Sequence, residues 1–181
     1  PTGKTILLFV AYNVNDANKG FGTFAQAVQS LIVRQPQLRE NICVVAVGRH
    51  ATTHRKDFAC EMIPFEYIAE RSTMRDIYRA SDIFTMVSIM ENLPNTIVEA
   101  KACGLPVVAT AVGGIRQMVR EGTDGFLVPP ADSQAFSEAL EKAIQHPRRQ
   151  DLATAARLDA EDTYDTAKVA QRYLALYQGE A

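Results

Sequence analysis

The chain has 181 residues, of which 47% are hydrophobic and 22% charged, and 19 basic against 21 acidic side chains give a net charge of −2. This length favours one domain with a sound core, and the balanced charge argues against nucleic acid as a partner. No apolar run approaches the ~20 residues of a membrane-spanning helix, and no signal-peptide pattern opens the chain. Three widely spaced cysteines, an odd number, indicate reduced thiols in a cytoplasmic protein: Cys43, Cys60 and Cys103.

The first predicted unit is a strand followed by a helix. Residues 5–12 form a continuous apolar run, which is typical of a central parallel strand buried on both faces. After a polar loop, residues 21–34 carry apolar side chains at helical spacing. The pair Lys19-Gly20 stands between them, so we expect Lys19 near the carboxyl end of the strand.

A second unit repeats this pattern. Residues 41–47 predict a buried strand that ends at Gly48-Arg49-His50, and residues 62–68 predict a short strand and loop that include Tyr67. Ser72 is a suitable N-cap for a helix over 73–79, on which Ile77 and Tyr78 face inward.

The chain is organised around residues 85–114. A strand over 83–87 leads into a polar loop, and a helix follows from about Asn95 to Cys103, with Asn95 or Thr96 as its N-cap. The free N–H groups of this helix would face the carboxyl end of the strand, where an anion fits. A strand over 107–110 and a close-approach loop at Gly113-Gly114 complete the crossover.

Two carboxylates belong to this stretch, Glu91 in the loop and Glu99 on the helix. Facing one crevice, they would accept hydrogen bonds from hydroxyl groups, in which sugars are rich. A hydrolytic acid/base pair is an alternative interpretation. A purely structural one pairs Glu99 with Lys101 or Arg116.

The remaining elements complete an α/β pattern. Residues 115–119 predict a short helix, 126–128 a strand, 133–145 a helix capped by Asp132, and 150–161 and 166–177 two terminal helices. We therefore expect a Rossmann-like three-layer α/β/α parallel sheet in a single domain, 1–181, with the terminal helices 150–178 packing around it. No Asp-x-Asp pair stands at a strand end, and Asp159 falls on a predicted surface helix, so no metal is expected.

The central stretch resembles a known signature. Glu91-Asn-Leu-Pro-Asn-Thr-Ile-Val-Glu-Ala100, continued by 102–110, by Val112-Gly113-Gly114 and by 125–130, is similar to the E-x7-E region of retaining GT-B glycosyltransferases of family GT4, the glycosyl transferases group 1. That fold has two Rossmann-like lobes facing each other across a cleft. The resemblance covers nearly the whole chain but only the second, C-terminal, donor-binding lobe, so we expect one lobe of a longer or split enzyme.

The resemblance also implies roles for individual residues. Lys19 would offset the charge of the departing diphosphate, Glu91 would hold the donor sugar and Glu99 the ribose. The other expected donor-binding residues are Asn92, Leu93, Pro94, Asn95 and Thr96 at the helix N-terminus, the amides of Gly113 and Gly114, Arg49 and Tyr67 near the base, and Arg116. Two departures from the family stand out: no arginine precedes Lys19, and Arg116-Gln117 replaces the usual Pro-Glu.

The expected activity is hexosyltransferase-like: retaining transfer from a nucleotide-diphosphate sugar to an acceptor hydroxyl, without a cofactor or metal. The usual setting is polysaccharide or cell-envelope glycan synthesis in the cytoplasm, with a glycan or lipid-linked acceptor on the missing lobe and peripheral contact with the inner face of the membrane. Alone, the chain would bind the donor weakly and not turn over. The alternatives are a GT-B-fold sugar-nucleotide epimerase and a non-catalytic nucleotide-binding or docking module.

Overall fold

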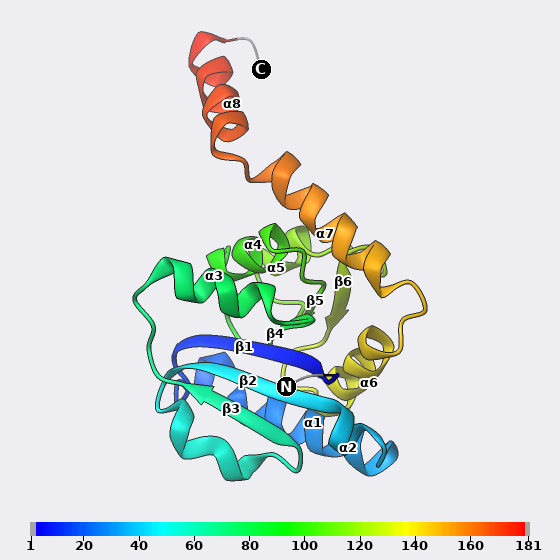
Figure 1. Ribbon diagram of the computed structural model, residues 1–181. Coiled ribbons are helices and arrows are strands. Elements are labelled where there is room, and N and C mark those ends of the chain that lie inside the picture. Colours follow the sequence, from blue (N-terminus) through cyan, green and yellow to red (C-terminus); the bar gives the residue numbers. More distant parts are fainter. Residues whose placement is uncertain (1–2, 180–181) are drawn as a thin grey trace.

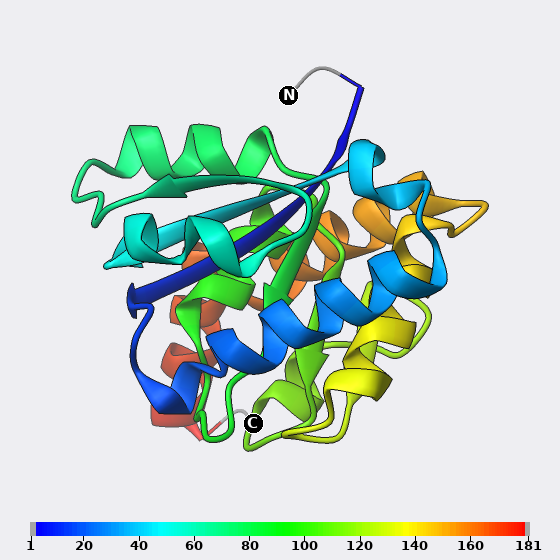
Figure 2. The ribbon, with the colours of Figure 1, turned by 90° about the horizontal axis from the view of Figure 1, so that it is seen from below.

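The computed structural model describes residues 3–179, and its strands form one parallel sheet in the order β3-β2-β1-β4-β5-β6 (Figures 1 and 2). Each strand overlaps an apolar run that the sequence predicts, and most side chains of every strand except β3, which lies at the edge of the sheet, are buried. The strands are β1 (Thr5–Asn13), β2 (Ile42–Arg49), β3 (Glu61–Phe65), β4 (Ile83–Met86), β5 (Val107–Thr110) and β6 (Gly125–Val128).

Helices cover both faces of this sheet, which confirms the predicted Rossmann-like three-layer fold (Figure 1). One core cluster joins the sheet to α1 and α6, and a second joins its other face to α3, α4 and α5. The helices are α1 (Phe21–Arg34), α2 (Leu38–Asn41), α3 (Arg71–Arg79), α4 (Asn95–Ala102), α5 (Ile115–Met118), α6 (Ser133–Ile144), α7 (Arg149–Thr163) and α8 (Thr166–Gln178), with 3-10 helices η1 (Ala17–Lys19) and η2 (Ala51–Asp57).

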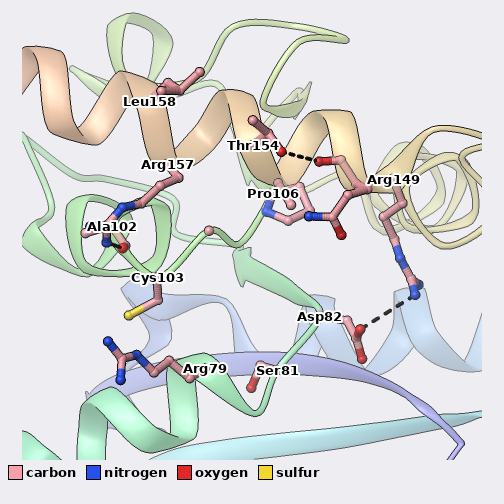
Figure 3. A pocket seen from close by; sticks show the side chains of 13 residues that line it. Arg79, Ser81, Asp82, Ala102, Cys103, Pro106, Arg149, Thr154, Arg157 and Leu158 are labelled. Carbon is pink, nitrogen blue, oxygen red and sulfur yellow. Dashed lines mark hydrogen bonds and ion pairs between the residues drawn. The ribbon is translucent and has the colours of Figure 1, made fainter.

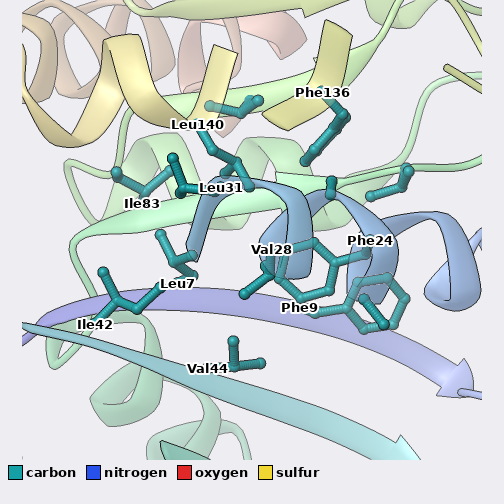
Figure 4. Packing of buried hydrophobic residues seen from close by; sticks show 14 of the residues in the cluster. Leu7, Phe9, Phe24, Val28, Leu31, Ile42, Val44, Ile83, Phe136 and Leu140 are labelled. Carbon is teal, nitrogen blue, oxygen red and sulfur yellow. The ribbon is translucent and has the colours of Figure 1, made fainter. Parts of the chain in front are cut away.

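Aromatic rings pack among aliphatic side chains between β1 and the helices α1 and α6 (Figure 4). The rings of Phe9 on β1 and Phe24 on α1 stack with centroids 5.7 Å apart, and Phe136 on α6 meets Phe24 edge to face. Phe9, Phe24 and Phe136 are each at most 2% exposed. Because such rings bury large apolar areas, this cluster fixes α1 against the sheet and so fixes where α1 begins.

The N-cap predicted for α3 is wrong by two residues. The N-cap is Glu70, whose carboxylate accepts hydrogen bonds from the amide and the hydroxyl of Ser72. Ser72 therefore lies inside the first turn and donates to the cap. Tyr78 faces the core as predicted, whereas Ile77 is only partly buried.

A buried cation joins α4 to α7. The ammonium of Lys101, which is fully buried, donates to the carbonyl of Met118 and to the carboxylates of Asp124 and Asp159. The sequence places Asp159 on a surface helix, but its carboxylate is only 17% exposed because α7 lies against α4. Arg120 also pairs with Asp124, so the charges in this cluster are mutually compensated.

The two terminal helices behave differently. Leu152, Ala156 and Ala160 of α7 are buried, but α8 has no buried residue among those described and stands away from the domain (Figure 1). The expected packing of the terminal helices around the domain therefore does not extend to α8. At the corner between α7 and α8, the Arg172 guanidinium donates to the carbonyls of Asp162 and Thr163. Over residues 3–179, no helix combines the length and apolarity that crossing a membrane requires.

We expect Lys101→Met to lower the free energy of unfolding by about 3 to 5 kcal/mol, because it removes the buried cation that Asp124 and Asp159 share and leaves them only the half-exposed Arg120. Lys168→Met is the matched control, since it removes a surface pair with Asp162 that contributes less than about 1 kcal/mol. Urea unfolding followed by circular dichroism measures both. Equal losses in the two variants would show that the buried cluster does not stabilise the fold.

Candidate functional site

The sheet has its topological switch point between β1 and β4. These strands are neighbours, and the chain winds away from them in opposite directions, toward β2 and β3 on one side and toward β5 and β6 on the other. In open parallel sheets a crevice forms outside the carboxyl ends of such a pair. The loops that follow β1 and β4 contain Lys19 and Glu91, respectively.

Glycine allows these two loops to touch. Gly20 is the N-cap of α1 and has a φ of 69°, and a Cβ on it would lie 2.1 Å from the carbonyl oxygen of Val87. Beside this contact the amide of Ile89 donates to the carbonyl of Asn18 at 2.8 Å. A side chain at position 20 would therefore separate the loops.

An ion pair spans the switch point. The Lys19 ammonium donates to Oε1 of Glu91, and the hydroxyl of Ser88 donates to the same oxygen at 3.0 Å. The Lys19 side chain is 31% exposed and that of Glu91 14%. Because an ammonium carries three donors, Lys19 keeps two for a further anionic ligand while Glu91 holds it in place.

The loop after β5 closes against the loop of Glu91. Gly113 has a φ of 48°, and a Cβ on it would lie 1.9 Å from the carbonyl oxygen of Glu91. The amide of Gly114 donates to the carbonyl of Asn92 at 2.9 Å. Gly114 therefore braces the loop with its N–H, which removes it from the ligand donors that the sequence suggests.

The N-terminus of α4 differs from its prediction by one residue. Its N-cap is Pro94, and no side chain caps the helix. Asn95 and Thr96 are the first helical residues, because the φ of −70° and ψ of 121° at Pro94 already suit an N-cap. The first amides of α4 are thus left without a side-chain acceptor, as an anion-binding helix end requires. Leu93, just before Pro94, is 58% exposed.

Glu99 lies one turn further along α4 and accepts a hydrogen bond from the phenol of Tyr78 at 2.9 Å. The purely structural interpretation, in which Glu99 pairs with Lys101 or Arg116, is wrong. Lys101 donates to Asp124, and Arg116 donates to the carbonyl of Ala111. Glu99 lines a pocket of about 580 Å³ between α3 and α4. The structure therefore gives the two glutamates different neighbours instead of one shared set.

Arg49 and Tyr67 form a further group over the carboxyl ends of β2 and β3. The guanidinium of Arg49 lies 4.5 Å from the centre of the Tyr12 ring, and the rings of Tyr12 and Tyr67 meet edge to face at 5.5 Å. Tyr12 and Tyr67 are more than half exposed. Neither Arg49 nor Tyr67 lines the pocket of Glu99, whereas Ile68 does.

The sequence does not predict three side chains that form hydrogen bonds at the carboxyl edge of the sheet: Tyr78, Ser88 and His54. A buried phenol needs a hydrogen-bond partner, so the inward face predicted for Tyr78 was a usable signal for its contact with Glu99. For the hydrogen bond from Ser88 to Glu91, the only indication in the sequence is that the two residues are three positions apart. No signal indicated His54, whose ring nitrogens lie 2.6 Å from Asp57 and from Asn15.

A hollow larger than the pocket of Glu99 lies at the opposite edge, outside the amino ends of β4 and β5 (Figure 3). It has a volume of about 620 Å³ and is lined by Arg79, Arg149 and Arg157. Arg149 pairs with Asp82, and Arg157 donates to the carbonyl of Ala102. The predicted site residues are absent from its lining, so size alone does not locate the site.

Comparison with known families identifies the chain. Residues 4–146 match the family model described as "Glycosyl transferases group 1". D-inositol 3-phosphate glycosyltransferase from Kribbella flavida is 29% identical over 164 residues, which are 84% of this chain and 39% of that protein.

Solved structures share the fold. Sucrose-phosphate synthase from Thermosynechococcus elongatus superposes with a TM-score of 0.81 at 22% identity, over 99% of this chain and 46% of that one. HepE from Anabaena, solved in complex with UDP and glucose, gives a TM-score of 0.78 at 19% identity, over 98% of this chain and 49% of that one.

The chain spans about two fifths to one half of the length of these relatives. The match to the family model covers most of the chain, and the structural neighbours are GT-B glycosyltransferases. The chain belongs to the glycosyl transferases group 1 family and has the Rossmann-like fold of one GT-B lobe.

Proposed function

We propose that this chain is the donor-binding lobe of a retaining GT-B glycosyltransferase of family GT4, and that it binds a nucleotide-diphosphate sugar. The observation that carries the proposal is the Lys19–Glu91 ion pair at the switch point. The uncapped N-terminus of α4 follows the same loop. A cation and free helix amides are the groups that bind a diphosphate. The HepE structure, which holds UDP and glucose in the same fold, supports this class of ligand.

In the proposed reaction the bond between the anomeric carbon and the diphosphate breaks while the oxygen of an acceptor hydroxyl bonds to that carbon on the same face, and the hydroxyl proton passes to the departing diphosphate. Negative charge builds up on the departing diphosphate, and Lys19 with the first amides of α4 offsets it. Glu91 holds the donor sugar's hydroxyls through Oε2, because Oε1 already accepts from Lys19 and Ser88. Glu99 holds the ribose. No metal takes part in this proposal.

The acceptor belongs to a part of the enzyme outside this chain, since the relatives are about twice as long. We propose a glycan or lipid-linked acceptor in polysaccharide or cell-envelope glycan synthesis, at the cytoplasmic face of the membrane. On this proposal the 181-residue chain binds nucleotide weakly and transfers no sugar on its own.

Calorimetric titration of the chain with UDP, GDP and ADP tests the proposal. We expect one of them to bind more tightly than the others, and that preference names the base of the donor. If the folded chain binds none of the three, it is not a nucleotide-binding lobe, and the interpretation as a docking module takes its place.

We expect Lys19→Ala to weaken binding of the preferred nucleoside diphosphate by about 10-fold to 100-fold, the equivalent of one to two charge-assisted hydrogen bonds. Affinity for the nucleoside without phosphates should not change, because the diphosphate is the part of the nucleotide that Lys19 binds in this proposal. Lys142→Ala, on the exposed side of α6, is the control. Equal affinities of the Lys19 and Lys142 variants for the diphosphate would remove Lys19 from the site.

Gly113→Ala should also abolish most nucleotide binding, because its Cβ would displace the Glu91 carbonyl and with it the ion pair. Gly122→Ala is a matched control: its φ of 68° imposes similar backbone strain, but nothing lies within 4 Å of its Cβ. Calorimetry measures the loss of nucleotide binding, and melting temperatures measure the loss of stability that backbone strain causes. Equal binding losses in both variants would mean that the close approach at Gly113 does not shape the site.

A further inference from the structure

The pocket between α3 and α4 has the size and lining of a nucleoside site. Its volume is about 580 Å³, within the usual range for small-molecule sites, and Ile68, Met74 and Tyr78 give it apolar walls. Glu99 is its only carboxylate among the lining residues, and Arg71 and Arg75 are exposed there. The pocket therefore offers one acidic group to a ligand that carries hydroxyls.

Tyr78 is held rigidly behind this carboxylate. Its side chain is 2% exposed, and its ring packs 6.0 Å from the ring of Phe84 on β4. The phenol oxygen lies 2.9 Å from Oε2 of Glu99. Glu99 itself is exposed, so without this bond its side chain would move among several rotamers.

The direction of this hydrogen bond is fixed. Burial, and then the neighbouring carboxylate of Glu99, raise the pKa of Tyr78 far above its ordinary value of 10.0. The phenol therefore keeps its proton and is the donor in the hydrogen bond to Glu99. The carboxylate of Glu99 accepts through Oε2, and within residues 3–179 the Glu99 side chain makes no other hydrogen bond or ion pair.

We propose that Tyr78 is a positioning residue for ribose recognition: it fixes the carboxylate of Glu99 so that Oε1 accepts the ribose hydroxyls of the bound nucleotide. This inference rests on the proposed function, in which Glu99 holds the ribose. It adds the reason why an exposed glutamate is ready to bind. Because Glu99 is already ordered, binding loses less side-chain entropy than it would with a mobile carboxylate.

The test uses Tyr78→Phe, which keeps the ring and removes only the hydroxyl. Titrate the chain with the nucleoside diphosphate that it prefers and with the 2′,3′-dideoxy form of the same compound. We expect the variant to bind the ribonucleotide about threefold to tenfold more weakly, as the entropy of one side chain predicts, and the dideoxynucleotide with unchanged affinity. Tyr164→Phe is the control, since Tyr164 packs partly buried against the same core cluster.

A double-mutant cycle with Glu99→Gln then shows whether Tyr78 acts through Glu99. We expect Tyr78→Phe to have no further effect on ribonucleotide binding once Glu99 is changed. Additive losses in the double-mutant cycle would mean that Tyr78 only maintains the structure, and so would equal losses of affinity for the ribonucleotide and its dideoxy form. An unchanged affinity of Tyr78→Phe for the ribonucleotide would also overturn the inference. If the unsubstituted chain binds no nucleotide, the proposed function fails first and this inference with it.

Discussion

The candidate site depends on one constraint, the change of winding direction between β1 and β4. In a parallel sheet each crossover helix must cover a face, so two neighbouring strands whose connections leave in opposite directions have open carboxyl ends. The loops after β1 and β4 meet in that opening. Lys19 and Glu91 are 72 residues apart in the sequence, yet they pair there. Once the strand order is set, their meeting follows from geometry alone.

Close backbone contact then sets the shape of the loops. Gly20 lies against Val87, and Gly113 lies against Glu91, at distances that no side chain permits. These contacts hold the loop of Glu91 from both sides, from α1 and from the β5 loop. The ion pair is therefore held by backbone packing as well as by its own charge, and Glu91 has little freedom to move.

The sequence predicts the strands and the long helices well, because buried parallel strands are continuous apolar runs and α1 and α6 carry clear amphipathic stripes. It predicts Lys19 and Glu91 as site residues through a resemblance, and the structure brings them into contact. It does not predict that Asp159 pairs with Lys101, because the two residues are 58 positions apart and no local pattern indicates that Asp159 is partly buried. The start of α4 at Asn95 is predicted correctly, but the N-caps of α3 and α4 are wrong, since a good capping residue such as Ser72 or Asn95 does not exclude Glu70 or Pro94 from that position.

The buried charge cluster has a mechanical consequence. Lys101 links α7 to α4, so sliding one helix past the other would break these ion pairs and leave buried charges without partners. Arg172 in turn locks the corner between α7 and α8. These contacts therefore run from α4, which carries Glu99, through α7 to α8, which carries the exposed side chains of Tyr173, Leu174 and Tyr177.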